Sequence, residues 1–186
     1  LFSLVQDELI YLESFFKEEC RRGRKVKHIY DSVQQAQSII PRLYLTITAG
    51  RVYIDSGEIN VKDIIFELLN MIKGVQNPTR GLFLRYYLLK MIKDKLPDNA
   101  EDLDTSIKFI IQNLEDMNRL WIRLSTGCSG NEKLLREKER NELKVLVGEN
   151  IIRLSSLESV TLEKYQDDIL PKLVNILLDS KDALSQ

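Results

Sequence analysis

Arg42 is the residue whose type and setting most clearly suggest a chemical role. It stands in IIPRLYLTITAG, residues 39–50, where nearly every neighbour is apolar, aromatic or β-branched. A guanidinium in such a setting is partly desolvated and needs a carboxylate or carbonyl partner. In the first turn of a helix it also meets the positive end of the macrodipole, which costs about 0.3 to 1 kcal/mol. Its partner is either a group of the same chain or a group of another protein.

Residue types that perform catalysis are sparse. His28 is the only histidine, so a Ser-His-Asp triad or a paired-histidine metal site has one imidazole at most. Neither GxxxxGK[ST] nor GxGxxG occurs, and no carboxylate has the apolar flanks that would raise its pKa for general acid catalysis. We expect a protein that is not an enzyme and carries no cofactor or metal.

Two further segments have a functional and a structural interpretation. The basic run RRGRKVK, residues 21–27, would suit an anionic membrane surface, but Glu18 and Glu19 precede it, and its cations favour a preceding helix C-terminus. We therefore interpret it as a solvated loop. Trp121 lies on a regular apolar stripe with Leu114 and Met117, which indicates a core residue rather than a ligand platform.

The composition indicates a packed protein without a nucleic-acid partner. Among 186 residues, 30% are charged and 44% hydrophobic, and 27 basic residues face 28 acidic ones, for a net charge of -1. Phosphate neutralisation needs a large local surplus of Lys and Arg, so this balance of charges argues against a nucleic-acid partner. No apolar stretch approaches the roughly 20 residues of a membrane span, and no signal peptide is recognisable. Cys20 and Cys128 do not suggest a disulfide scaffold or a zinc site, so a cytoplasmic setting fits. The missing initial Met suggests a piece of a longer chain.

Helical periodicity recurs from end to end and predicts eight helices. Start and stop signals include Gly23 after the first helix, Gly74 as a C-terminal cap, Asn77-Pro78 at a helix start, and Thr161 as an N-cap. A Gly/Ser-rich loop is expected at 125–131. The apolar faces of the eight helices span residues 5–20, 26–40, 43–54, 61–72, 82–92, 107–124, 135–154 and 162–177.

Three of these segments depart from simple helical periodicity. Residues 43–49 alternate as a strand would, and we favour a helix because every neighbouring segment is helical. Pro171 lies inside the last segment and predicts a kink or break. At the start of the seventh helix, alternating charges at residues 137–144 predict a solvated face, with Leu135, Leu143, Leu146, Ile151 and Leu154 facing the core.

Helix spacing predicts the architecture. Eight segments give roughly 46 residues per helical pair, the range of HEAT and armadillo repeats. We therefore expect an all-α fold, a right-handed α-solenoid of HEAT-like antiparallel helix pairs, with residues 1–186 forming one such segment. A compact helical bundle is the alternative, although a bundle is not expected to begin with apolar residues such as Leu1, Phe2 and Leu4.

Six motifs resemble the amino-terminal part of the retromer scaffold family, vacuolar protein sorting-associated protein 35. They follow one another in order over nearly the whole chain, and PRLYL together with RGLFLR is highly specific. The motifs are DELIYLE at 7–13, GRKV at 23–26, PRLYL at 41–45, GVQNPTRGLFLRYYLL at 74–89, MNRLWIR at 117–123 and REKERNELKVLVG at 136–148.

The resemblance implies a non-catalytic α-solenoid scaffold that sorts cargo in retrograde transport from endosomes. In this family the amino-terminal end holds the arrestin-like subunit, vacuolar protein sorting-associated protein 26. The family's binding motif corresponds here to Pro41, Arg42, Leu43, Tyr44 and Leu45. Whether these side chains contact the partner or act by packing two helices is left open by the sequence.

The same resemblance implies further partners and a location. Sorting nexins and a Rab GTPase associate with the amino-terminal region, without residues that can be assigned here. The metallophosphoesterase-like subunit would bind only through a carboxy-terminal region outside this chain. Membrane association would be peripheral, through partners, at the cytosolic face of endosomes. The alternative functions are a HEAT-type adaptor of nuclear transport or phosphatase assembly and, in another class, a helical enzyme or its regulatory subunit.

Overall fold

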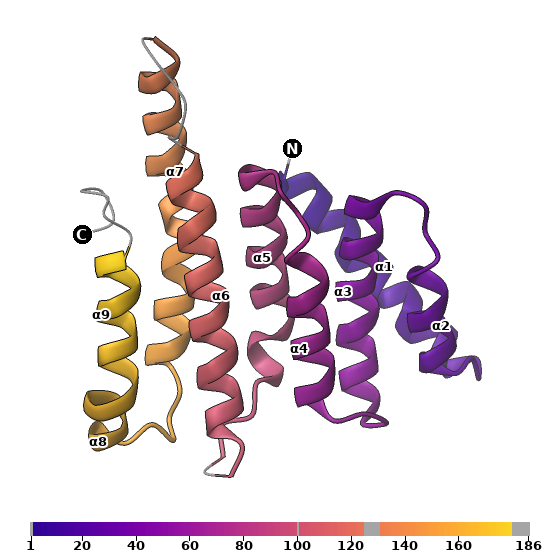
Figure 1. The fold of residues 1–186 in the computed structure, drawn as a ribbon. Coiled ribbons are helices and arrows are strands. Elements are labelled where there is room, and N and C mark those ends of the chain that lie inside the picture. Colours follow the sequence, from indigo (N-terminus) through magenta and orange to yellow (C-terminus); the bar gives the residue numbers. More distant parts are fainter. Residues whose placement is uncertain (1, 100, 125–130, 180–186) are drawn as a thin grey trace. The chain divides into compact units, whose positions relative to one another are not determined.

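The computed structural model describes residues 2–99, 101–124 and 131–179, and this part of the chain is helical without any strand (Figure 1). The predicted all-α class is therefore confirmed. The predicted loop at 125–131 falls, up to residue 130, outside the described residues, as do Cys128 and the side chains of the apolar start. The elements are α1 (Phe2–Arg21), α2 (Val26–Val33), α3 (Ile39–Ser56), α4 (Val61–Ile72), α5 (Pro78–Ile92), the 3₁₀ turn η1 (Lys93–Lys95), α6 (Leu103–Arg123), α7 (Asn131–Ser155), α8 (Leu162–Lys164), the π turn η2 (Tyr165–Ile169) and α9 (Leu170–Asp179).

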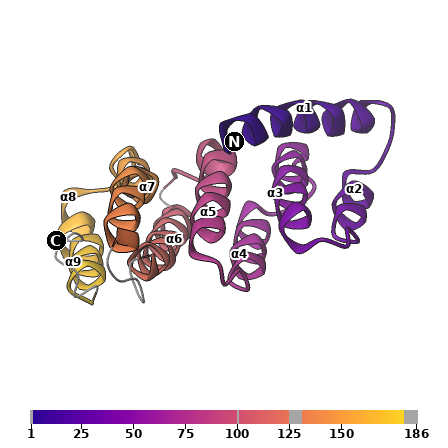
Figure 2. The same cartoon turned by 90° about the horizontal axis from the view of Figure 1, so that it is seen from above.

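The helices pack as two compact units. Unit 1 contains residues 1–74 and 87–95, and unit 2 contains residues 75–86 and 96–186. Within unit 1, α2, α3 and α4 pack side by side with alternating direction, and α1 crosses α2 and α3 at a steep angle (Figure 2). Within unit 2, α7 runs antiparallel to α6, which also contacts α9. Antiparallel neighbours in chain order are consistent with the predicted α-solenoid.

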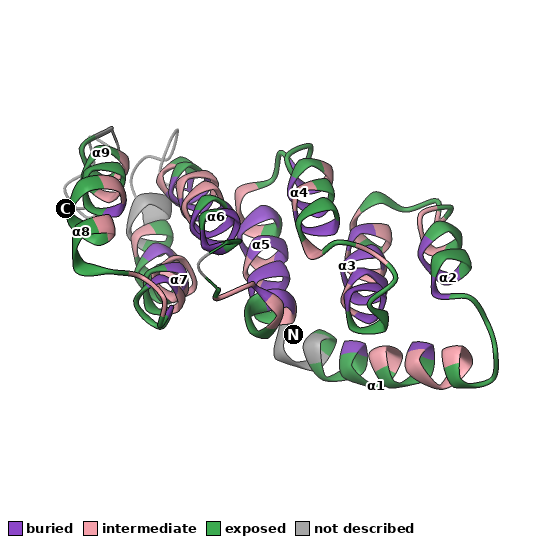
Figure 3. Cartoon of the chain, turned by 90° about the horizontal axis from the view of Figure 1, so that it is seen from below, coloured by how far each residue is buried: buried purple, intermediate pink, exposed green. Residues whose placement is uncertain are grey.

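Helix α3 is buried on nearly all sides beyond its first turn. The predicted face of Leu43, Ile47, Gly50 and Ile54 is buried, and so is most of the opposite face (Figure 3). The strand-like alternation arose because both faces of this helix are apolar or satisfied internally. Thr46 is buried at 1% exposure, and its hydroxyl donates to the carbonyl of Arg42 at 2.8 Å.

Two helix boundaries differ from the predicted ones. The second helix ends at Val33, and α3 begins at Ile39, so Pro41 lies in the first turn of α3, where a missing N–H costs nothing. Gly74 was expected as a C-terminal cap just beyond α4; it does follow the helix end directly, but Lys73 holds the C-cap position with φ -56 and Gly74 is not among the glycines with a positive φ. The left-handed cap that the sequence did not reveal is Gly57, with φ 72 after α3.

Other capping signals are confirmed. Gly23 after α1 has φ 97, as expected for a glycine stop. The Asn77 Oδ1 atom accepts the backbone N–H of Arg80 at 3.0 Å, and Pro78 is the first residue of α5. The Thr161 hydroxyl accepts the backbone N–H of Lys164 at 3.2 Å. The expected break near Pro171 is present as the π turn η2, which lies directly before this proline.

The face that α7 buries agrees with the predicted one only in part: Leu154 is buried, and Leu143 and Leu146 pack against the core around Trp121. Leu135 is 59% exposed and Ile151 is 45% exposed, whereas Arg140 on the predicted solvated face is only 2% exposed. The Arg140 guanidinium carbon lies 4.1 Å from the centre of the Trp121 ring, and the Trp121 indole donates to the Arg140 carbonyl at 2.8 Å. Trp121 is thus a core residue, as predicted. A cation stacked on an aromatic ring therefore occupies a buried position of α7, where the apolar pattern predicted a residue exposed to solvent.

A buried ion pair joins α5 to α6 inside unit 2. The Arg85 and Asp116 side chains are 4% and 13% exposed, with a guanidinium nitrogen 3.0 Å from a carboxylate oxygen. Burial lowers the pKa of Arg85, and the neighbouring carboxylate opposes that shift. The helix RGLFLRYYLL was correctly predicted to be buried on two sides, but this arginine was not expected inside the core.

We predict that Asp116→Ala lowers the free energy of unfolding by about 3 to 5 kcal/mol, because it leaves the Arg85 cation buried without its carboxylate. Urea unfolding of the 186-residue chain measures the change. Asp167→Ala, which removes an exposed carboxylate of the same unit, serves as the control and is expected to shift stability by less than about 0.5 kcal/mol. Equal losses in the two variants would contradict the role given to the pair.

Candidate functional site

The five residues of the PRLYL segment occupy the first two turns of α3 but differ in exposure. Pro41 is exposed, Arg42, Tyr44 and Leu45 are half-buried, and Leu43 is only 7% exposed. Directly before them, Ile39 is 60% exposed. The start of α3 is therefore exposed at Ile39 and Pro41, and from Leu43 onward the helix packs into unit 1.

Arg42 binds a carbonyl of its own chain. Its Nη1 atom donates to the carbonyl oxygen of Ala36 at 3.3 Å. Ala36 lies in the connector between α2 and α3, residues 34–38. No carboxylate of the described residues forms an ion pair with this guanidinium. From the sequence we expected either a carboxylate or a carbonyl as the partner of Arg42. Within the described residues the partner is a carbonyl.

Tyr44 is fixed by a residue of α5. Its ring centre lies 5.2 Å from that of Tyr87, with the planes inclined by 54°. The Tyr87 hydroxyl is 2.9 Å from the hydroxyl of Thr48, which itself donates to the Tyr44 carbonyl at 2.8 Å. Burial raises the pKa of both tyrosines to about 12, so both phenols stay neutral near pH 7. The PRLYL motif and the RGLFLRYYLL motif therefore meet in one buried network.

The other end of α3 is anchored by Asp55. Its carboxylate lies 3.2 Å from Lys17 of α1, 2.9 Å from Lys95 of η1 and 3.4 Å from Arg51 of α3. Arg51 also donates to the Met91 carbonyl at 2.5 Å. Burial alone would raise the pKa of Asp55, but hydrogen bonds from Lys95 and Lys17 and the charge of Arg51 lower it overall. This cluster ties three elements of unit 1 together.

The basic run at residues 21–27 behaves as a solvated loop. Arg21, Arg22 and Arg24 are exposed and lie 3.4 to 3.6 Å from the carboxylates of Glu18 and Glu19. These are the acidic residues that the sequence offered as neutralising partners. His28 is exposed, and its backbone carbonyl accepts the Ser32 hydroxyl.

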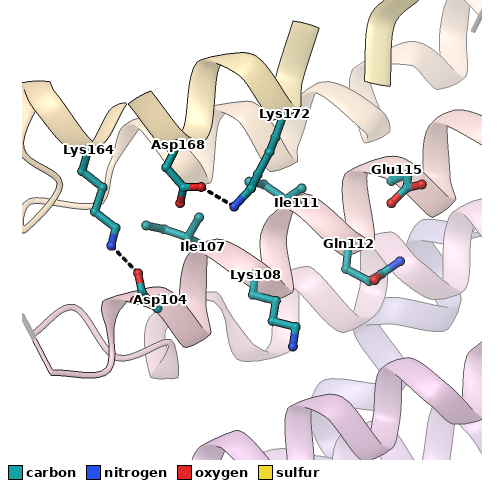
Figure 4. A pocket seen from close by; sticks show the side chains of 9 residues that line it. All are labelled: Asp104, Ile107, Lys108, Ile111, Gln112, Glu115, Lys164, Asp168 and Lys172. Carbon is teal, nitrogen blue, oxygen red and sulfur yellow. Dashed lines mark ion pairs between the residues drawn. The ribbon is translucent and has the colours of Figure 1, made fainter. Parts of the chain in front are cut away.

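Unit 2 holds a charged cleft and an apolar groove. The cleft, of about 420 Å³, lies between α6 and the α8–α9 segment (Figure 4). Four of its charged side chains form two ion pairs, since Lys164 pairs with Asp104 and Lys172 lies 2.5 Å from Asp168. The groove, of about 490 Å³, is lined by apolar side chains of α6, α7 and α9, with Asn118 and Lys144 as polar members.

The described ranges contain neither a candidate membrane span nor a candidate metal site. No helix there combines the length and apolar character needed to cross a bilayer. No group of three or more histidine, cysteine or acidic side chains there is arranged to hold a metal ion.

Comparison with known proteins identifies relatives over the full chain. The sequence matches the family described as Vacuolar protein sorting-associated protein 35 over residues 1–186. It is 45% identical over 193 residues to Vacuolar protein sorting-associated protein 35C of Arabidopsis thaliana and 42% identical over 191 residues to Vacuolar protein sorting-associated protein 35 of Dictyostelium discoideum. Each match covers 100% of this chain and 24% of the relative.

A third relative gives the same result. The chain is 42% identical over 167 residues to Vacuolar protein sorting-associated protein 35 of Schizosaccharomyces pombe, a match that covers 85% of this chain and 20% of that protein. The chain thus spans about a quarter or less of the length of these curated relatives.

We predict that Thr48→Val lowers the free energy of unfolding by about 1 to 3 kcal/mol, because the buried Tyr87 hydroxyl loses its hydrogen-bond partner. Urea unfolding measures the loss. Thr46→Val is the matched control, since that buried hydroxyl bonds only to the Arg42 carbonyl within the described residues, and a smaller loss is expected. If Thr46→Val costs as much as Thr48→Val, the link to Tyr87 contributes nothing.

We also predict that Asp55→Asn lowers stability at pH 7 by about 1 kcal/mol, the range of a partly exposed ion-pair network. Because the pKa of Asp55 is lowered in the folded state, its contribution is present above its unfolded pKa and disappears as pH falls through the folded pKa. Thermal unfolding between pH 7 and pH 3 should show the variant converging on the wild type in acid. Parallel curves at all pH values would contradict the prediction, and Asp63→Asn supplies an exposed control.

Proposed function

The chain belongs to the vacuolar protein sorting-associated protein 35 family, and from this membership we propose that it is part of a non-catalytic scaffold of the retromer complex. In that role it acts in retrograde transport of cargo from endosomes to the Golgi or the plasma membrane. It works in the cytoplasm, at the cytosolic face of the endosome membrane, and reaches that membrane through its partners.

The arrestin-like retromer subunit is the proposed partner of the PRLYL segment. Support comes from the motif itself, intact from Pro41 to Leu45, and from its place at the outward start of α3. One observation carries the proposal: within the described chain Arg42 has a carbonyl rather than a carboxylate for a partner, although it is half-buried. Such an arginine serves an interface either by meeting the partner with its remaining donors or by ordering the segment that meets it.

Further partners are proposed on family membership alone. They are a sorting nexin, a Rab GTPase and, through a carboxy-terminal region outside this chain, the metallophosphoesterase-like subunit. Neither nucleic acid nor a substrate for turnover is part of this proposal.

We predict that Arg42→Ala weakens binding to the purified arrestin-like subunit at least tenfold, about 1.4 kcal/mol, because the variant loses the guanidinium and its hydrogen bond to the connector between α2 and α3. Isothermal titration calorimetry on the 186-residue chain measures the affinity, and circular dichroism checks that helicity is unchanged. Arg21→Ala, which truncates a side chain that is 77% exposed, is the control and should bind like the wild type.

Two results would oppose this proposal in different ways. Equal affinity of wild type and Arg42→Ala would remove Arg42 from the site. A wild-type chain that does not bind the arrestin-like subunit would refute the partner assignment itself.

A further inference from the structure

We propose that the partner touches Ile39 and the connector between α2 and α3, while Arg42, Leu43 and Tyr44 act as positioning residues behind that contact. This inference rests on the proposed function and deepens it, because it assigns direct contact to residues outside most of the PRLYL motif. The surface consists of residues 34–41 and is called the connector surface below.

Exposure separates the two groups of residues. Ile39 is 60% exposed and Pro41 is exposed, so both side chains are open to a partner. Leu43 is 7% exposed, and the ring of Tyr44 packs against Tyr87. A partner cannot reach Leu43 without opening unit 1. The direct contact must therefore come from the start of α3 and the segment before it.

The chemistry of the connector surface is that of an interface centre. Its sequence, QQAQSIIP, contains no charged residue, in a chain that is 30% charged. Gln35, Gln37 and Ser38 are exposed beside Ile39 and Pro41. The centres of protein interfaces are depleted of charge, because an ion that loses its water there is costly, whereas neutral amides can bind a partner's backbone.

Arg42 holds the connector surface against α3. Short-range backbone bonds fix the connector to α2, from Gln35 to Ser32 at 3.1 Å and from Ala36 to Val33 at 3.3 Å. From the α3 side, the Arg42 side chain reaches back to the Ala36 carbonyl at 3.3 Å. Figure 1 shows this connector as an open arch between the two helices. Without the guanidinium, the connector keeps its backbone hydrogen bonds to α2 but loses the side-chain hydrogen bond from α3.

The connector surface fits a partner surface that is apolar at its centre and carries amides around it. An apolar recess would receive the Ile39 side chain, with Pro41 at its edge. Backbone or side-chain amides around that recess would bind Gln35 and Gln37. A large single-sign charge on the partner would not suit, because the connector surface offers no counterion before Arg42.

The direct contact is tested by Ile39→Ser. We expect this variant to lose at least tenfold in affinity for the arrestin-like subunit, with circular dichroism and melting temperature unchanged, because the side chain is exposed. Ile10→Ser is the matched control, since Ile10 is 53% exposed on α1 of the same unit, and its affinity should stay within twofold of the wild type. A second variant, Gln37→Glu, puts a charge on the connector surface and should also weaken binding without a change in melting temperature.

The positioning role of Arg42 is tested by hydrogen exchange in the free chain. Arg42→Ala should speed exchange of the backbone amides at residues 36–38, whereas Ile39→Ser should leave that rate unchanged. Unchanged exchange in Arg42→Ala would overturn the positioning role.

The outcomes separate this inference from the function on which it rests. If Arg42→Ala weakens binding while Ile39→Ser and Gln37→Glu bind like the wild type, the connector surface is not the contact and the proposed function stands. If the wild-type chain does not bind at all, the proposed function fails and the inference falls with it.

Discussion

The close enclosure of α3 is the constraint on which the rest of unit 1 depends. A helix surrounded by others must satisfy its polar groups without water, and α3 does so by bonding Thr46 and Thr48 to its own carbonyls. It must also let neighbours come close, and a side chain at Gly50 would meet Leu68 at 3.1 Å. Because the body of α3 is fixed in this way, its first turn is held in place from the body of the helix, in addition to the Arg42 hydrogen bond to the Ala36 carbonyl.

Apolar periodicity predicted the helices well because most buried faces here are apolar. It was incomplete for α7, where the buried face also carries Arg140 and Asn150. The Asn150 Oδ1 atom accepts the amide of Asn113 at 2.9 Å, and Arg140 stacks on Trp121. A polar residue that is satisfied by a partner far along the chain looks in the sequence like a surface residue. The helix boundary near Val33 was missed for a related reason, since apolar residues continue past it into the connector.

The candidate site stays a prediction, and the sequence indicated the setting of Arg42 but not the geometry around it. The setting of Arg42 indicated a desolvated cation, and the structure holds it half-buried on a carbonyl. Nothing local to PRLYL indicated that Tyr44 meets Tyr87, or that Asp55 gathers cations from α1 and η1, because such contacts join distant segments. Nor does the sequence separate Ile39 from Leu43. Both are apolar residues of the same run. Ile39 is exposed and Leu43 is buried because their side chains meet different surroundings at the start of α3.

The proposed division between contacting and positioning residues would explain how a motif with only one exposed residue, Pro41, serves recognition. Binding is tighter when the contacting segment is already ordered, because less conformational entropy is lost on association. The buried leucine and the tyrosine network keep the start of α3 ordered, and the Arg42 side chain extends that order to the connector. Under this proposal, a change at a buried member acts on stability and affinity together, whereas a change at the exposed Ile39 acts on affinity alone. A binding assay without a parallel measurement of stability would not distinguish a loss of folding from a loss of contact with the partner.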